Sequence, residues 1–135
     1  MIKNLQEALE PLALLQKEAK LAIRRAELTV ANRIADEARA EAPGSLGNKI
    51  SVEQTEDETI IDAGDELSAY VEFGTGQNAE AFLAGKPDEQ VAEAKKFFVN
   101  GEGTLKAHPF FFPAIYRHRD EIIEEVNNEL SKLNA

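Results

Sequence analysis

The chain has 135 residues, a formal net charge of −10 and no cysteine. This length predicts one domain that can fold without a disulfide or a metal, and the lack of cysteine excludes a disulfide framework and a thiolate metal site. The apolar runs are shorter than a membrane span, and Gln6, Glu7 and Glu10 interrupt any signal-peptide core. We therefore expect a soluble protein made in the cytoplasm.

The negative charge is concentrated in the C-terminal part of the chain. Residues 1–50 hold eight Lys/Arg and seven Asp/Glu, whereas residues 51–135 hold seven Lys/Arg and eighteen Asp/Glu. Between Ser51 and Phe73 there are eight acids and no base. Such a surface repels phosphate groups, which disfavours ordinary nucleic-acid binding. The acidic surface either keeps the protein soluble or forms a wall past which DNA slides without binding.

A long amphipathic helix is expected over residues 2–41. Pro11 lacks an amide donor, so we expect a kink there or the start of a second helix. Small residues in the middle of its apolar stripe allow close approach of a neighbouring element, with a coiled coil as the alternative. The helix should stop at Pro43 and Gly44. The stripe has steps of three and four residues and consists of Leu5, Leu9, Leu12, Leu15, Ala19, Ala22, Ala26, Val30 and Ile34.

A three-stranded meander is expected next. Residues 49–52 alternate polar and apolar side chains, and residues 59–63 are rich in β-branched residues, so the two segments predict a hairpin. A third strand is expected over residues 67–73, with Gly74 and Gly76 ending it. The turn of the hairpin carries three acids: Glu56, Asp57 and Glu58.

The rest of the chain predicts further helices around one more strand. Residues 77–103 look like an inserted loop and helix, because the strand at 67–73 and a fourth near 104–108 could pair without them. A second long helix is expected over residues 113–133, with Pro113 in its first turn. Its bases come early and its acids late, which opposes the helix dipole, so a partner or water should compensate them. These residues are Arg117, Arg119, Glu124, Glu125 and Glu129.

The predicted fold class is α+β in a single domain over residues 1–135. It has a long N-terminal helix (1–42), a meander (43–76), an inserted loop and short helix (77–103), and a strand, turn and C-terminal helix (104–135). The antiparallel sheet would have three to four strands, with the C-terminal helix packed on it.

Recognisable catalytic and metal-binding patterns are absent from the sequence. His108 and His118 do not have the spacing of a known metal or triad motif. Three carboxylates lie at one turn (Asp62, Asp65 and Glu66). Side-chain hydrogen bonds to the turn backbone explain them better than a cation site does. The glycines at residues 73–76 lack the layout of a phosphate-binding loop. We expect no catalytic residue, no cofactor and no metal.

The run Phe110-Phe111-Phe112 is the most unusual local feature. Neighbouring side chains in an extended segment point to opposite sides, so the three rings cannot all face the same way. At least one should cover an adjacent helix or meet another chain, because exposed aromatics mark interfaces. The candidate subunit-interface residues are Tyr70, Glu72, Phe73, Phe110, Phe111 and Phe112.

Two segments together resemble a known protein family. The first is Tyr70-Val71-Glu72-Phe73-Gly74-Thr75, and the second is Pro109-Phe110-Phe111-Phe112-Pro113-Ala114. With the break at residues 43–46 after a long Ala-rich helix, they are similar to tailed-bacteriophage tail-component proteins of the tail-completion and head–tail joining type. The resemblance covers about residues 20–133. The break has a different residue order from the usual one, and residues 77–103 are longer than the minimal family layout.

The resemblance implies a structural protein of a phage or prophage virion rather than an enzyme. Members of the class assemble as rings, commonly hexamers, on the tail axis, where they contact tail-tube and neck or head-closure proteins. Glu56, Asp57 and Glu58 would then face the lumen through which DNA passes. The alternative is a non-virion helical module that binds or regulates another protein through the Ala-rich helix.

Overall fold

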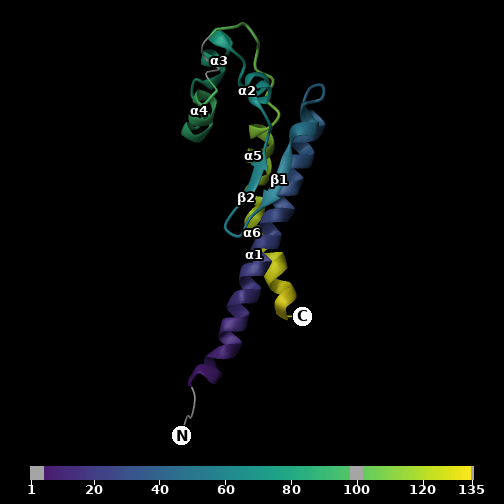
Figure 1. Cartoon of the computed structure of the whole chain (residues 1–135), viewed down its shortest axis with the longest axis vertical. Helices are drawn as coiled ribbons and strands as arrows, with labels where there is room; N and C mark the ends of the chain where they lie inside the picture. Colours follow the sequence, from purple (N-terminus) through teal and green to yellow (C-terminus); the bar gives the residue numbers. More distant parts are fainter. Residues whose placement is uncertain (1–4, 98–101, 135) are drawn as a thin grey trace.

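The computed structural model describes residues 5–97 and 102–134 as an α+β unit built around one long helix, α1 (Figure 1). In order, the elements are α1 (Leu5–Glu41), η1 (Leu46–Lys49), β1 (Ser51–Gln54), β2 (Thr59–Asp62), α2 (Glu66–Phe73), α3 (Gly76–Leu83), α4 (Asp88–Lys95), α5 (Phe112–His118), α6 (Glu121–Ser131) and η2 (Lys132–Asn134).

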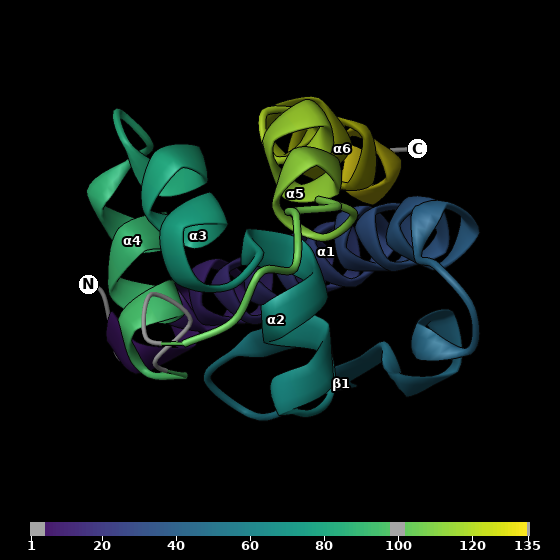
Figure 2. The same cartoon turned by 90° about the horizontal axis from the view of Figure 1, so that it is seen from above.

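The C-terminal half of α1 carries most of the other elements, while its N-terminal part extends beyond them (Figure 1). The β1–β2 hairpin and the α5–α6 pair both pack on this C-terminal half. Helices α3 and α4 lie to one side of the molecule, and α2 lies nearer its centre, as the view from above shows (Figure 2). The expected long helix is confirmed. It runs through Pro11 without ending, so the predicted start of a second helix there is wrong.

The predicted hairpin is confirmed, and its two strands pair antiparallel with Val52 opposite Ile61. Within the described residues the sheet has these two strands only, so the prediction of three to four strands is wrong. Both strands alternate exposed and half-buried residues, because one face of the hairpin lies against α1. Val52 and Ile61 point into the core on that face.

Residues 66–73 form helix α2 instead of the predicted third strand. The Asp65 carboxylate accepts a hydrogen bond from the amide of Leu67 (3.1 Å) and caps the helix start. Gly74 ends the helix with φ 79°, a conformation that favours glycine. The buried residues of α2 come in adjacent pairs four positions apart, as one face of a helix requires: Ser68, Ala69, Glu72 and Phe73.

The predicted fourth strand near residues 104–108 is an extended segment without a ladder partner. It forms two backbone bonds to the end of α2 and the turn after it. The Thr75 amide donates to the Leu105 carbonyl (2.9 Å), and the His108 amide donates to the Val71 carbonyl (2.7 Å). A helix end leaves carbonyls without partners in the helix, and the extended segment satisfies one of them.

The predicted C-terminal helix over residues 113–133 is divided into α5 and α6, which are separated at Arg119 and Asp120. The Arg119 amide still donates to the Ile115 carbonyl (2.9 Å), so the backbone stays helical up to the division. Both helices pack on α1. Ile115 of α5 and Ile122 of α6 join the core cluster that also receives the hairpin.

Two apolar clusters form the core. The larger joins α1, η1, the hairpin and α5, and its buried members are Val30, Ile34, Ala35, Ala38, Leu46, Ile50, Phe110 and Ala114. The smaller joins α2, α3 and α4 through Ala69, Phe73, Ala79 and Ala94. The small alanines of α1 allow its neighbours to approach closely, as the sequence predicts.

Candidate functional site

The two segments that carry the family resemblance meet at one side chain, Glu72. Its Oε2 atom accepts hydrogen bonds from the amides of Phe110 (2.6 Å) and Phe111 (3.0 Å). Its Oε1 atom accepts one from the amide of Phe112 (2.8 Å). A carboxylate from α2 therefore holds three successive amides at the start of α5, where the amides have no partner within the helix. We call this arrangement the Glu72 joint.

The Glu72 joint lies inside the molecule, and the residue Glu72 is 3% exposed. Burial raises the pKa of Glu72 above its ordinary value, while the three backbone hydrogen bonds act in the opposite direction. A buried carboxyl group whose own pKa is raised can also mark a proton-transfer group. Here both oxygens are engaged with the chain's own backbone, so the arrangement joins two parts of the fold.

Glycines allow the two segments to approach closely beside this joint. A Cβ atom on Gly74 would lie 2.8 Å from the Ala107 amide nitrogen and 2.9 Å from the Leu105 carbonyl oxygen. A Cβ atom on Gly76 would overlap the Gly103 carbonyl oxygen. Both glycines have positive φ, which other residues adopt with strain. The close approach explains why glycines, and no other residues, end this segment.

The three phenylalanines divide between the two core clusters. Phe110 is fully buried in the larger cluster, and Phe111 packs against the same cluster. Phe112 packs against the smaller cluster, with its ring centroid 5.7 Å from that of Phe73. As the sequence predicts, the rings do not all face the same way. The triplet therefore connects helices α2, α3 and α4 with the larger cluster formed by α1, η1, the hairpin and α5.

The candidate subunit-interface residues differ in exposure. Glu72, Phe73 and Phe110 are buried by the chain itself, so they have no free surface in a single copy. Tyr70, Phe111 and Phe112 are half-buried and keep part of their surface. For these six residues the interface role stays a prediction, and the half-buried three are best placed for it.

The candidate lumen-facing acids lie together at the tip of the hairpin. Glu56, Asp57 and Glu58 are all exposed. The turn is closed by a hydrogen bond from the Thr55 amide to the Glu58 carbonyl (2.8 Å) and by one from the Glu58 amide to the Thr55 hydroxyl (3.1 Å). The sequence prediction of an acidic turn is therefore confirmed, and the three carboxylates form one exposed patch.

A cleft of about 370 Å³ opens next to the Glu72 joint, between β2, α2 and α4. We call it the aromatic cleft. The hydroxyl of Ser68 lines it and is buried without a hydrogen-bond partner in the described part of the chain. Its acids are Asp62, Asp65, Glu72 and Glu93, and no Lys or Arg lines it. Its apolar residues are Ile60, Ile61, Ala63, Ala69, Phe73, Phe97, Phe110, Phe111 and Phe112.

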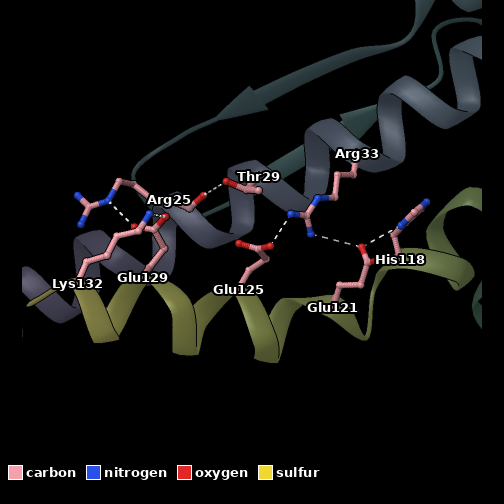
Figure 3. A network of polar contacts seen from close by, with 8 residues as sticks. All are labelled: Arg25, Thr29, Arg33, His118, Glu121, Glu125, Glu129 and Lys132. Carbon is pink, nitrogen blue, oxygen red and sulfur yellow. Dashed lines mark hydrogen bonds and ion pairs between the residues drawn. The ribbon is translucent and has the colours of Figure 1, made fainter.

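The acids of the C-terminal helices find their partners on α1 (Figure 3). Arg25 contacts Glu129 (3.2 Å), and Arg33 contacts Glu125 and, at 3.6 Å, Glu121. The two segments run antiparallel, so bases of α1 oppose acids of α6. The charge order that opposes the helix dipole is thus compensated within the chain.

The reverse pairing holds the start of the C-terminal segment. Arg117 of α5 contacts Glu37 and Glu41 of α1, each at 3.0 Å. His118 lies 3.3 Å from Glu37 through Nε2 and 2.9 Å from Glu121 through Nδ1. The hydrogen bond with Glu121 raises the pKa of His118 above its ordinary value.

Residues 5–97 and 102–134 contain no group of three or more His, Asp or Glu side chains placed to hold a metal ion. Asp62 and Asp65 instead bond to the backbone of their own turn, at Gly64 (2.8 Å) and Leu67 (3.1 Å). No helix in the same part of the chain has the length and apolar character needed to cross a membrane.

Sequence reasoning missed the partner of Glu72 and the cleft beside it. With residues 67–73 taken as a strand, Glu72 would share a face with Tyr70 and have no partner. The available signal was the pair Asp65 and Gly74, a helix-start residue and a helix-stop residue that bracket one short helix.

Comparison with protein-family models, curated proteins and solved structures found no match to this chain.

Proposed function

We propose that this protein is a structural component of a tailed-phage virion, and that it completes the tail or joins head and tail as a ring on the tail axis. The Glu72 joint is the observation that carries the proposal. The two segments that resemble the tail-component family, far apart in the sequence, form this one buried joint through three hydrogen bonds.

The form of the joint supports a mechanical role. The carboxylate bonds to backbone amides, the rings of Phe110 and Phe112 enter two different core clusters, and the glycines close the contact. These features fix helices to one another, as a subunit that carries load in a ring requires. Tail-tube and neck or head-closure proteins are the expected neighbours, and hexamers are the expected assembly. Turnover of a substrate plays no part in the proposal.

In such a ring the hairpin tip would face the lumen. Its carboxylates are exposed and adjacent, so they would repel the phosphates of passing DNA. Reversing the charge of Glu56, Asp57 and Glu58 together should slow or arrest DNA ejection from otherwise complete particles. Normal ejection from those particles would contradict the proposal that these acids face the lumen, but it would not contradict the proposed ring.

Particles made without this protein provide the direct test of the virion role. We expect heads and tails that fail to join, or tails of irregular length, and purified protein should restore infectivity when it is added back. Immunogold labelling should place the protein at the tail end or neck. Infectious particles of normal appearance in its absence would contradict the proposal.

The N-terminal part of α1 favours a second candidate, a helical module that binds another protein outside a virion. Leu12, Leu14 and Leu15 are each at least half exposed there, and exposed apolar side chains mark interaction sites. Light scattering separates the candidates, because rings, free or on tail tubes, support the first. A monomer or dimer that never associates with tubes supports the second.

A further inference from the structure

We propose that residues 104–108 of one copy of this chain pair, as a parallel strand, with the free edge of β2 in a second copy. The inference rests on the proposed ring, and it names the contact between neighbouring subunits. It joins two extended segments, each of which has one edge without a backbone partner in the described part of the chain.

Strand β2 has one edge that its own chain leaves open. The Thr55 amide donates to the Glu58 carbonyl (2.8 Å), so these two residues form a hydrogen-bonded pair at the end of the hairpin. Bonded and non-bonded pairs alternate along an antiparallel ladder. With Val52 opposite Ile61, the backbone groups of Thr59 and Ile61 therefore point away from β1. Within residues 5–97 and 102–134, no other backbone segment bonds to them.

Two clefts lie along this open edge. The aromatic cleft borders it at residues 60–65. A second cleft of about 600 Å³, which we call the β2–α6 cleft, borders it at residues 59–61 and is also lined by Val30, Ala31 and Ile34 of α1. An edge strand with free donors and acceptors is a template for another strand. An extended segment with apolar side chains on one face is therefore the occupant that suits this edge.

Residues 104–108 form an extended segment whose outer edge is also open. Leu105 bonds to Thr75 through its amide (2.8 Å to the hydroxyl) and through its carbonyl (2.9 Å from the amide). Successive residues of an extended chain direct their backbone groups to opposite sides. The amide and carbonyl of Lys106 therefore face away from α2, and neither bonds to another backbone group in the described part of the chain.

The two open edges fit together in a parallel register. The Lys106 amide would donate to the Thr59 carbonyl, and the Ile61 amide would donate to the Lys106 carbonyl. Lys106 then lies opposite Ile60, on the exposed face of the hairpin. Leu105 lies on the other face, toward α1. Its side chain is 46% exposed in a single copy, and the β2–α6 cleft would cover it.

Antiparallel pairing of the same edges is disfavoured. It would place Lys106 directly opposite Ile61, whose side chain packs against the core cluster on the α1 face. An ammonium group in apolar surroundings without a partner is costly. The alternation of exposed and half-buried residues in β2 therefore favours the parallel direction.

The parallel register also brings two unpaired charges together. Lys106 and Asp62 form no ion pair in the described part of the chain. Asp62 shares the exposed face with Ile60, so it would be a diagonal neighbour of Lys106, within reach of a long side chain. One Asp62 oxygen accepts the Gly64 amide (2.8 Å), and the other is free of such a bond.

A second copy of this chain is the occupant that these features favour. Its residues 104–108 supply the open edge, the exposed Leu105 and the unpaired base. Pairing of two β2 edges with each other would give a closed dimer and would leave Leu105 and Lys106 uncovered. A contact between two different surfaces instead closes into a ring when the rotation between copies allows it.

Disulfide formation tests the register, because the chain has no cysteine of its own. Ile60→Cys and Lys106→Cys variants carry tags of different mass and are mixed and oxidised, free over a concentration series and bound to tail tubes. We expect the mixed disulfide to predominate. Glu53→Cys is the matched control, because Glu53 is exposed and lies opposite Ile60 on β1, about 10 Å from Lys106 in the proposed sheet.

Two results of this experiment would overturn the inference. One is an equal yield with Glu53→Cys in place of Ile60→Cys. The other is the absence of the mixed product both in solution and on tail tubes.

Hydrogen exchange tests the backbone pairing without changing the sequence. The amides of Ile61 and Lys106 should exchange at least tenfold more slowly in the associated protein than in the monomer. The Ile60 amide faces β1 and should be protected in both states, which makes it the internal control. Unchanged exchange at Ile61 in an associated state would contradict the inference.

A double-mutant cycle tests the ion pair. Lys106→Glu should raise the concentration at half association severalfold, and Asp62→Asn, which keeps an acceptor for Gly64, should raise it less. The two changes together should raise it less than the product of their separate effects. Lys95→Glu, an exposed change on α4, is the control and should have no effect. Helix content and the unfolding midpoint of each variant confirm that it folds. A Lys106→Glu variant that associates like the parent protein would contradict the inference.

The inference and the proposed function fail separately. If the protein is located at the tail end or neck but no mixed disulfide forms, the ring uses another contact. If the mixed disulfide forms in solution while infectious particles assemble without the protein, the contact stands and the virion role is wrong.

Discussion

The amide of Phe112 at the start of α5 donates a 2.8 Å hydrogen bond to the carboxylate of Glu72 in α2, across 40 positions of sequence. Through this bond and its two neighbours, one side chain links the two apolar clusters. The stability of the protein should therefore depend on Glu72 more than on any exposed acid.

Replacing Glu72 tests the joint directly. Glu72→Ala leaves three buried or part-buried amides without acceptors, and we expect a loss of about 3 kcal/mol in the free energy of unfolding. Glu72→Gln keeps one acceptor oxygen but turns an amide donor toward a backbone donor, so the loss should be about 1–2 kcal/mol. Urea denaturation measures both. Glu80→Gln, an exposed change on α3, should stay within about 0.5 kcal/mol, and an equal loss there would argue against a special role for Glu72.

Gly76→Ala should be costly for two reasons. The residue has φ 57°, and a Cβ atom would meet the Gly103 carbonyl, so we expect a loss of about 2–4 kcal/mol. Gly85 provides the matched comparison, because its φ is 78° but nothing lies within 4 Å of a Cβ atom there. Gly85→Ala should cost only the backbone term, about 1 kcal/mol. Equal thermal midpoints for the two variants would show that the close approach at Gly76 does not matter.

The ion pairs between α1 and α6 should show their orientation in a charge-swap experiment. Arg33→Glu places a negative charge opposite Glu125 and Glu121, and we expect a lower urea midpoint. Adding Glu125→Arg to that variant should recover part of the loss, because the pair re-forms in reverse. Screening by salt should shrink the difference. If the double variant is less stable than the single one, the antiparallel pairing shown in Figure 3 does not hold the helices together.

His118 should make stability depend on pH above 6.5, the ordinary pKa of histidine. Its pKa in the folded protein lies above the ordinary value of 6.5, mainly because of the hydrogen bond with Glu121. A raised folded-state pKa means that the contribution is fully present below pH 6.5 and is lost as pH rises through the folded-state value. The contribution should be on the order of 0.5 kcal/mol, since the side chain is partly exposed.

His118→Gln is the control for that dependence. The difference in unfolding free energy between the parent protein and this variant should fall as pH is raised from below 6.5 through the folded-state pKa of His118. A difference that stays constant, or that grows with pH, would contradict the assigned direction.

The sequence predicts those elements whose periodicity has one interpretation. The long apolar stripe of α1 fits only a helix, and the hairpin segments with an acidic turn between them fit only paired strands. Residues 67–73 fit two periods, because Ala69 and Phe73 lie on one side of a strand and also one turn apart on a helix. The capping carboxylate of Asp65 and the left-handed Gly74 favour the helix.

The joint and the cleft depend on contacts that local patterns do not specify. The partners of Glu72 lie 38 to 40 positions away, and their approach requires the path of the chain through α3 and α4. The same holds for Arg33 and Glu125, whose pairing follows from the antiparallel course of α6 along α1. Residue types alone therefore identified several of the participants but not which of them meet.

The backbone bond between Thr75 and Leu105 has a consequence for how the length of this chain can vary. The segment between Thr75 and Leu105 begins and ends at this bond. The two ends of the segment therefore stay fixed, whatever its length. The entropy of closing a loop grows only with the logarithm of its length. Insertions in the turn at Gly85, where the surroundings are open, should consequently be tolerated. A reporter peptide placed there should leave the folding and the stability of the protein unchanged.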